Sequence, residues 1–275
     1  MTEEVVRAEQ GLGFDNVPEI YDRVRPTYPP ALFDALLSYL GSPRPGGLRA
    51  VEIGPGTGQA TRSLLERGIA VSAVEPGARL AAFLSKKLAA FSTLEVVNAK
   101  FEDAVLESGA FDLILAATSF HWVDRALRWE KCHALLNARG ALAIVSTNQI
   151  ESAADGGFFD RVQPIYDRHQ PDDGEGDGGF ELPGEDVVPE EYSEIESSEL
   201  FGEVALHRYR WDQHYTTQEY GDLMRSYSRT QAMEPAAQDA LISDVCALVD
   251  REFAGSLTRP LVITLTLGRR REVPA

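Results

Sequence analysis

The middle of the chain repeats one pattern, in which a short run of apolar residues is followed by a longer stretch of mixed polarity. The apolar runs predict strands at residues 48–53, 70–75, 94–98, 111–116 and 141–146. The stretches between them predict helices at 57–67, 78–90 and 125–137. Strands that are apolar throughout and alternate with helices are typical of a parallel sheet covered on both faces. The pattern therefore predicts an α/β fold of the Rossmann-like type.

The segments on either side of this core predict further elements. Two helices are expected at 17–24 and 31–40, before a turn-rich connector at 41–47. After residue 150 we expect a helix at 157–169, a strand at 204–215, helices at 217–226 and 235–253, and a strand at 260–267. These elements predict a seven-stranded, mostly parallel sheet with a helical cap inserted between the last strands. The expected division is an N-terminal lid (1–47), a nucleotide-binding core (48–150), and a region with an acidic loop, the cap and the final strands (151–275).

Charge changes the picture in one segment. The formal net charge is −17, and residues 171–200 contain twelve acidic residues and no basic one. We expect this Gly- and Pro-rich stretch to be a mobile surface loop. The rest of the chain carries about −5, whereas a protein that neutralises phosphates needs a basic face. A small-molecule substrate is therefore expected, and a nucleic acid is not.

Composition sets the remaining expectations about partners and location. Of the 275 residues, 44% are hydrophobic, which is enough for a sizeable core. No apolar run reaches the roughly 18 residues that span a bilayer, and the N-terminus is too polar for a signal peptide. Cys132 and Cys246 are far apart, and neither they nor the histidines show metal-ligand spacing. We expect a cytoplasmic monomer or homodimer with reduced thiols, no metal and no membrane contact.

The segment 51–61, VEIGPGTGQAT, contains the most informative chemistry. A strand ends at Ile53, glycines follow at positions 54, 56 and 58, and a helix then begins. Gly54 can adopt the positive φ that a tight strand-to-helix turn requires. Gly56 and Gly58 leave bare backbone beside the free N–H groups of the helix start. Such a turn at the carboxyl edge of a parallel sheet is where nucleotides bind.

Two acidic residues bear on which nucleotide this is. The dinucleotide pattern G-x-G-x-x-G requires glycine where this chain has Gln59, which is weak evidence against NAD. Glu52, just before the turn, would repel a pyrophosphate but suits an ammonium group, such as that of S-adenosylmethionine (SAM). Glu75 follows Gly54 by 21 positions and suits two ribose hydroxyls. NAD enzymes share this last feature, so Glu75 does not discriminate.

At this point the sequence resembles the class I SAM-dependent methyltransferases. VEIGPGTG (51–58) matches their motif I, and AVEP (73–76) matches their motif II. YDRVRPTYP (21–29) and SFHWVD (119–124) are similar to the type 11, trans-aconitate-methyltransferase-like branch. These stretches extend over about half the chain, and region 151–275 adds little. The resemblance implies a Rossmann-like fold, SAM as cofactor and S-adenosylhomocysteine as product.

The resemblance also implies roles for individual residues. The methionine end of SAM would be surrounded by Glu52, Gly54, Gly56, Thr57 and Gly58; the ribose and adenine would contact Glu75, Pro76, Phe101, Glu102 and Ala117; and a lid would contain Tyr21, Arg25 and Tyr28. Lys100 stands where relatives often have an acidic residue. Phe101 either packs on the adenine or belongs to the core. Arg25 pairs with the carboxylate of SAM, with a substrate acid or within a helix-end salt bridge.

Methyl transfer from a sulfonium mainly requires alignment in a dry pocket, which can supply roughly 7–11 kcal/mol. A general base is needed only for a poorly acidic O–H or an N–H group. His121 is the candidate base; the alternative is that His121 and Trp122 line the pocket or pack on the next helix. Asp124 is expected to be that helix's N-cap. Aromatic side chains of the cap are candidate pocket linings: Trp211, Tyr215, Tyr220, Met224 and Tyr227.

The sequence favours SAM-dependent methylation of a small molecule at oxygen, nitrogen or a carboxylate. Arg225 and Arg229 would suit a carboxylate substrate, whereas the acidic loop would suit an amine. A nicotinamide-dependent oxidoreductase, a non-catalytic SAM-binding protein and a macromolecular methyltransferase are the alternatives. Titration with SAM and NADH distinguishes the oxidoreductase from the preferred function. Measurement of turnover distinguishes the non-catalytic SAM-binding protein from it.

Overall fold

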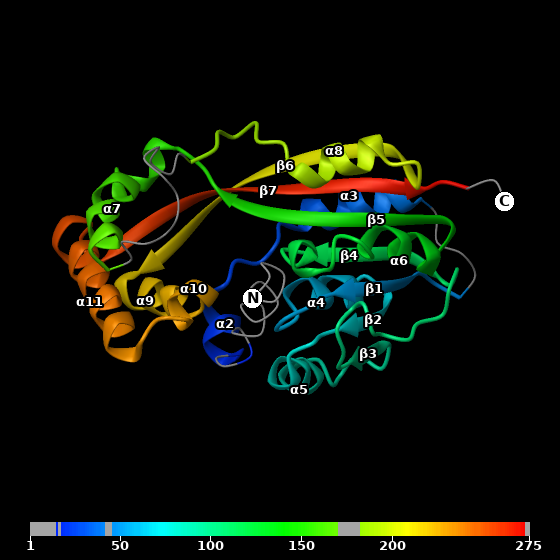
Figure 1. Ribbon diagram of the computed structural model, residues 1–275, viewed down its shortest axis with the longest axis horizontal. Helices are drawn as coiled ribbons and strands as arrows, with labels where there is room; N and C mark the ends of the chain where they lie inside the picture. The colour runs from blue at the N-terminus through cyan, green and yellow to red at the C-terminus, as the bar shows by residue number, and fades with distance from the viewer. Residues whose placement is uncertain (1–14, 16–17, 42–45, 170–181, 273–275) are drawn as a thin grey trace.

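The computed structural model describes residue 15 and residues 18–41, 46–169 and 182–272. Its centre is a seven-stranded sheet in the order β3-β2-β1-β4-β5-β7-β6 (Figure 1). The strands are β1 (Arg49–Ile53), β2 (Ala70–Val74), β3 (Leu94–Val97), β4 (Phe111–Ala117), β5 (Leu136–Gln149), β6 (Phe201–Thr216) and β7 (Ser256–Arg270). Strands β1 to β5 are parallel, and β7 runs antiparallel to both of its neighbours. The predicted α/β, Rossmann-like fold with seven strands is therefore confirmed.

Helices cover both faces of the sheet, because the strands are apolar on both sides. One buried cluster joins the sheet to α3 (Pro30–Leu40), α4 (Gln59–Leu65) and α5 (Ala78–Lys87). A second cluster on the opposite face joins it to α6 (Arg128–Leu135) and α8 (Glu190–Ser197). The parallel register sets Ile53 beside Val74 on one side and Ala116 on the other. The carboxyl ends of these strands therefore meet at one edge of the sheet.

A separate cap lies beyond that edge. Strands β6 and β7 extend past the rest of the sheet and carry the cap, on the left of Figure 1. Its helices are α7 (Phe158–His169), α9 (Thr217–Arg225), α10 (Ser228–Gln231) and α11 (Pro235–Glu252), and α2 (Pro18–Val24) packs against α9. These helices have a hydrophobic core of their own, to which Val24 of α2 contributes. No helix in the part of the chain that the structure describes is long and apolar enough to cross a membrane.

Part of the acidic stretch is ordered, and this corrects the expectation of a surface loop over 171–200. The segment 170–181 lies outside the described residues, but α8 forms within the remainder. Ile195 of α8 is fully buried against the sheet. Glu194 forms an ion pair with Arg128, whose side chain is only 2% exposed. A buried cation thus attracts this acidic helix to the sheet.

The expected N-cap at Asp124 also differs from the structure. Helix α6 begins at Arg128, and its N-cap residue Leu127 provides no side-chain hydrogen bond. The carboxylate of Asp124 instead accepts a hydrogen bond from the Ala126 N–H at 2.8 Å, within the turn before the helix. Asp124 therefore stabilises the turn before the helix and not the helix start itself. Its residue type fits both roles, because short polar side chains stabilise such turns as well as helix starts.

The pair between Arg128 and Glu194 generates a prediction about stability. Glu194→Gln should lower the free energy of unfolding by about 2 kcal/mol, because it leaves a buried guanidinium without a counter-charge. The cost should stay below the ~3–5 kcal/mol of fully buried pairs, since Glu194 is 28% exposed. Urea unfolding at neutral pH measures the difference. Glu199→Gln, on the exposed surface just after α8, is the control. Equal losses in the two variants would contradict the prediction.

Candidate functional site

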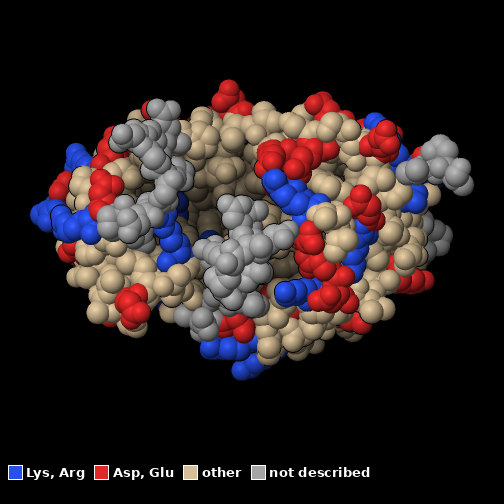
Figure 2. Space-filling model, in the orientation of Figure 1, with Lys and Arg blue, Asp and Glu red and all other residues tan. Residues whose placement is uncertain are grey.

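A cavity of about 450 Å³ opens at the carboxyl ends of the strands, between the sheet and the cap. The face drawn in Figure 2 is hollowed between these two parts of the molecule. Strands β1, β2, β4, β5 and β7 contribute to its lining, and α2 and α9 border it from the other side. This volume lies within the usual range of small-molecule sites, about 300–1,000 Å³.

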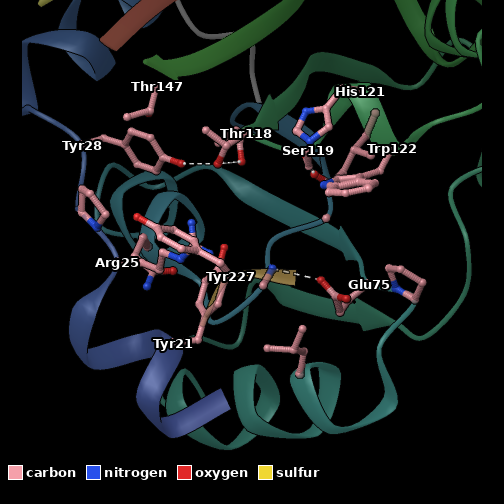
Figure 3. A pocket seen from close by; sticks show the side chains of 18 of the residues that line it. Tyr21, Arg25, Tyr28, Glu75, Thr118, Ser119, His121, Trp122, Thr147 and Tyr227 are labelled. Atoms are coloured by element: carbon pink, nitrogen blue, oxygen red, sulfur yellow. Dashed lines mark hydrogen bonds between the residues drawn. The ribbon is translucent and has the colours of Figure 1, made fainter. Parts of the chain in front are cut away.

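The glycine turn after β1 forms one wall of this cavity. The Gly54 N–H donates to the Val74 carbonyl at 2.9 Å, so the turn begins from the sheet ladder. The Glu75 carboxylate then accepts from the Gly56 N–H at 3.0 Å (Figure 3). It also accepts from the Gly77 N–H at 2.9 Å. Glu75 is 5% exposed, and burial raises its pKa although both N–H bonds oppose the rise. Each carboxylate oxygen holds one backbone donor and keeps lone-pair capacity for a further donor in the cavity.

The three glycines of the turn differ in what surrounds them. A Cβ at Gly54 would lie 2.8 Å from the Ser119 Cβ, and one at Gly58 would lie 2.4 Å from a methyl of Leu84 on α5. These two positions allow close packing of backbone against neighbouring elements. A Cβ at Gly56 would meet only the Tyr21 ring, at 3.6 Å. Of the three, Gly56 therefore has the most open surroundings for a ligand that approaches from the cavity.

Glu52 lies at the end of β1 on the face opposite to the Ile53 side chain. It is 1% exposed, and its Oε2 has no hydrogen-bond partner among the described residues. Burial raises its pKa to about 7, helped by the nearby Glu75 charge and opposed by Thr61. Two carboxyl groups are thus buried close together under the turn, and both favour the protonated form more than free carboxyl groups do.

Helix α2 and the segment after it form a lid over the turn. The Arg25 guanidinium lies 4.8 Å from the ring centroid of Tyr21 and 5.0 Å from that of Tyr227. It donates to Oγ and to the carbonyl of Ser226, at 3.1 and 2.9 Å. Arg25 therefore bridges α2 to the end of α9. The Tyr28 hydroxyl is 3.2 Å from Oγ1 of Thr118, which ties the lid to the end of β4.

The opposite wall follows β4. Thr118 has φ = 56°, a left-handed conformation that is uncommon for a residue with a branched Cβ. It leads into a short 3₁₀ helix, Phe120–Trp122, where His121 lies 4.6 Å from the Trp122 ring. The Ser119 hydroxyl donates to the Ile53 carbonyl at 2.5 Å. These bonds set His121 and Trp122 beside the glycine turn, as Figure 3 shows.

Most residues expected to bind a cofactor line this cavity. They are Tyr21, Arg25, Gly54, Gly56, Glu75, Pro76, Phe101, Glu102 and Ala117, with the candidate base His121. Glu52, Thr57 and Gly58 do not line it. Glu52 is behind the strand end, Gly58 packs on α5, and the Thr57 carbonyl accepts from Lys87 at 2.9 Å. These three therefore lie behind the turn and outside the cavity lining, and the binding roles of all the expected residues stay predictions.

The structure adds residues that the sequence analysis missed. Arg259 of β7, Gln149 of β5 and Thr147 of β5 line the cavity on its cap side. Of the expected aromatic linings, Tyr215 and Tyr227 border the cavity, whereas Tyr220 and Met224 are buried in the core of the cap and Trp211 packs at the edge of the sheet core. Arg225 and Arg229 are not part of the lining. A lone arginine at the start of the apolar run 260–267 was the available signal for Arg259.

Comparison with known proteins agrees with this geometry. Residues 51–144 match the family model of a methyltransferase domain. Uncharacterized methyltransferases of Mycobacterium tuberculosis and Mycobacterium bovis are 32% identical over 139 residues, which is 50% of this chain. Over residues 51–144 the chain is therefore similar to a methyltransferase domain. The match extends over 54% of those mycobacterial relatives, so the chain spans about half of their length.

Solved structures support the methyltransferase fold over most of the chain. A putative type II methyltransferase from Anaeromyxobacter dehalogenans is 19% identical with a TM-score of 0.61, covering 91% of this chain and 99% of that one. Phosphoethanolamine N-methyltransferase 2 of Haemonchus contortus, in complex with phosphomonomethylethanolamine and S-adenosylhomocysteine, is 14% identical with a TM-score of 0.53. That match covers 94% of this chain and 58% of the nematode protein. At these identities the likeness concerns the fold.

The buried carboxyl of Glu52 generates a prediction about pH. Its pKa of about 7 lies above the 4.5 of a free glutamate, so the folded state binds this proton more tightly. The resulting stability is fully present below about pH 4.5 and is lost as pH rises through 7, by roughly 2–3 kcal/mol. Glu52→Gln stays neutral, so its free energy of unfolding should fall less between pH 5 and pH 8. Chemical denaturation at both pH values checks this.

The exposed Glu66→Gln serves as the control and should keep the pH profile of the unmodified protein. A Glu52→Gln variant whose stability falls as steeply as that of the unmodified protein would show that the carboxyl of Glu52 titrates normally.

Proposed function

We propose that the protein is a methyltransferase that binds SAM along the glycine turn and transfers its methyl group to a small-molecule acceptor in the cap half of the cavity. The observation that supports this most strongly is that one cavity extends over both the glycine turn and the cap. It extends from Glu75 and Pro76, beyond the turn, to Thr147, Tyr227 and other residues near the cap. A cofactor bound near the turn and an acceptor bound near the cap would therefore meet inside one cavity.

The residues around the turn fit the chemical groups of SAM. The buried Glu75 carboxylate suits the two ribose hydroxyls as hydrogen-bond donors. Phe101 is 3% exposed and lines the cavity, which suits a flat adenine ring. Lys131 donates to the carbonyls of Glu102 and Ala104, both at 2.8 Å, and the Glu102 carboxylate accepts from the Asp124 N–H at 2.7 Å. The loop after β3 is therefore held in place before a ligand binds.

When bound, SAM supplies a methyl group that its sulfonium already activates. The protein's part is to align the acceptor with that methyl and to exclude water, which can contribute roughly 7–11 kcal/mol. Tyr21, Tyr28 and Arg25 of the lid close the cavity on the side of the turn. His121 lines the same cavity and is our candidate general base for an acceptor with a poorly acidic O–H or an N–H.

The face drawn in Figure 2 agrees with a small acceptor. Acidic and basic side chains are intermixed around the hollow, so the described residues form no broad basic surface on this face. Binding to a nucleic acid backbone depends on such a surface. Within the described residues there is also no group of three or more His, Cys, Asp or Glu side chains that would hold a metal ion.

Calorimetric titration with SAM, S-adenosylhomocysteine and NADH tests the cofactor. We expect both adenosyl ligands to bind and NADH not to bind. Glu75→Gln should weaken SAM binding by about 10- to 100-fold, because hydrogen bonds to a charged group contribute roughly 1.5–3 kcal/mol. Glu95→Gln, an exposed acid on β3, is the matched control. Binding of NADH alone would overturn the proposed function, and equal SAM affinity in the two variants would remove Glu75 from the ribose site.

Measurement of turnover tests whether His121 acts as a general base. A panel of small acids, amines and phenols identifies an accepted substrate. With an amine or phenol, His121→Asn should lower kcat by about 10²- to 10⁴-fold, the usual contribution of a general base. The affinity for SAM should not change. The exposed His207→Asn on β6 is the control. An unchanged kcat would assign His121 to lining the pocket.

A further inference from the structure

Arg259 presents a positive charge to the cap side of the cavity and has no carboxylate partner within the described part of the chain. Its Nε and Nη2 both donate to Oε1 of Gln149, at 3.1 and 2.5 Å, and its Nη1 donates to the Tyr227 hydroxyl. These acceptors are an amide and a phenol, and neither is a carboxylate. Among the residues that the structure describes, no Asp or Glu forms an ion pair with Arg259. Other arginines of the chain do have such pairs, as Arg128 has with Glu194.

The phenols around Arg259 do not replace a counter-charge. Burial raises the pKa of Tyr215 and of Tyr220 well above the ordinary value, so both are neutral at physiological pH. A guanidinium keeps its charge in proteins and presents five N–H donors. Three of these are used by Gln149 and Tyr227, which leaves two for a ligand. A partly buried cation with free donors strongly favours an anion that can accept both.

Distance separates Arg259 from the ribose end of the proposed cofactor site. Glu75 follows β2 and Arg259 is on β7, and β1, β4 and β5 lie between these two strands. Four strand spacings correspond to about 19 Å. The cavity lining also includes Tyr215, Leu223 and Leu261, which are aromatic or apolar. This end of the cavity therefore combines the guanidinium of Arg259 with apolar and aromatic side chains. Arg25, which lies 5.0 Å from the Tyr227 ring centroid, adds a second positive charge nearby.

We propose that the acceptor is a small organic acid, whose carboxylate is bound by Arg259 and whose apolar part packs among the tyrosines of the cap. Gln149 and Tyr227 act as positioning residues, because they fix three of the five N–H donors of the guanidinium and leave the other two for the acid. This inference rests on the proposed function, since it assigns the occupant of the acceptor half. It replaces Arg225 and Arg229, which do not line the cavity.

The test compares acids with amides of the same shape. The 275-residue chain, saturated with S-adenosylhomocysteine, is titrated calorimetrically with benzoate, phenylacetate and 3-phenylpropionate, and with the three corresponding amides. We expect at least one acid to bind at least tenfold more tightly than its amide. Arg259→Gln should lower the affinity for that acid by 10- to 100-fold, and Arg259→Lys should lower it less. The exposed Arg251→Gln at the end of α11 should bind it like the unmodified protein.

Each result separates this inference from the proposed function. If the unmodified protein binds no adenosyl ligand, the proposed function fails. If S-adenosylhomocysteine binds but no acid is preferred over its amide, or Arg259→Gln keeps the acid affinity, the inference alone is overturned. A tenfold loss of S-adenosylhomocysteine affinity in Arg259→Gln would overturn it too, because Arg259 would then serve the cofactor. Circular dichroism establishes whether the variants fold. If Arg259→Gln does not fold, Arg259→Lys, which keeps the positive charge, takes its place in the comparison.

Discussion

The candidate site depends on a carboxylate that is buried at the end of β2 and held by two backbone N–H groups. Glu75 accepts from Gly56 of one turn and Gly77 of the next, so a single side chain joins the two loops that follow β1 and β2. Removing this acid from water is unfavourable, and the hydrogen bonds offset part of that cost. The cavity wall is therefore formed in advance by the fold, and a ligand does not need to order it.

The rest of the molecule is arranged around this edge. The parallel strands bring their carboxyl ends together, while α2 and the cap approach from outside the sheet. Arg25, between the rings of Tyr21 and Tyr227, joins the beginning of the described chain to the cap. The cavity is thus enclosed by elements that are about 200 residues apart in sequence, and its two halves have different chemistry: acids and bare backbone near the turn, tyrosines and Arg259 near the cap.

The features that could be predicted from the sequence are those that depend on neighbouring residues. The five core strands, the three helices between them and the turn at 51–58 follow from local periodicity and glycine spacing, and the final strand follows from its β-branched residues. Helix α8 was missed because its position depends on the distant Arg128, and acidic composition alone favours a loop. Arg259 was missed for the same reason, since only the pairing of β5 with β7 brings it beside Gln149. The exclusion of Glu52 from the cavity depends on which face of β1 it occupies.

The way the cap joins the sheet has a consequence for how such a protein diversifies. Helices α9 to α11 form one excursion that leaves β6 at Thr216 and returns to β7 at Ser256, two residues that are paired across the ladder. The excursion therefore begins and ends at adjacent points, as a hairpin loop does. Its length and composition can change through insertion, deletion or recombination without altering the register of any strand. Such changes would leave the glycine turn and the carboxyl ends of β1, β2 and β4 where they are, because none of these lies within the excursion.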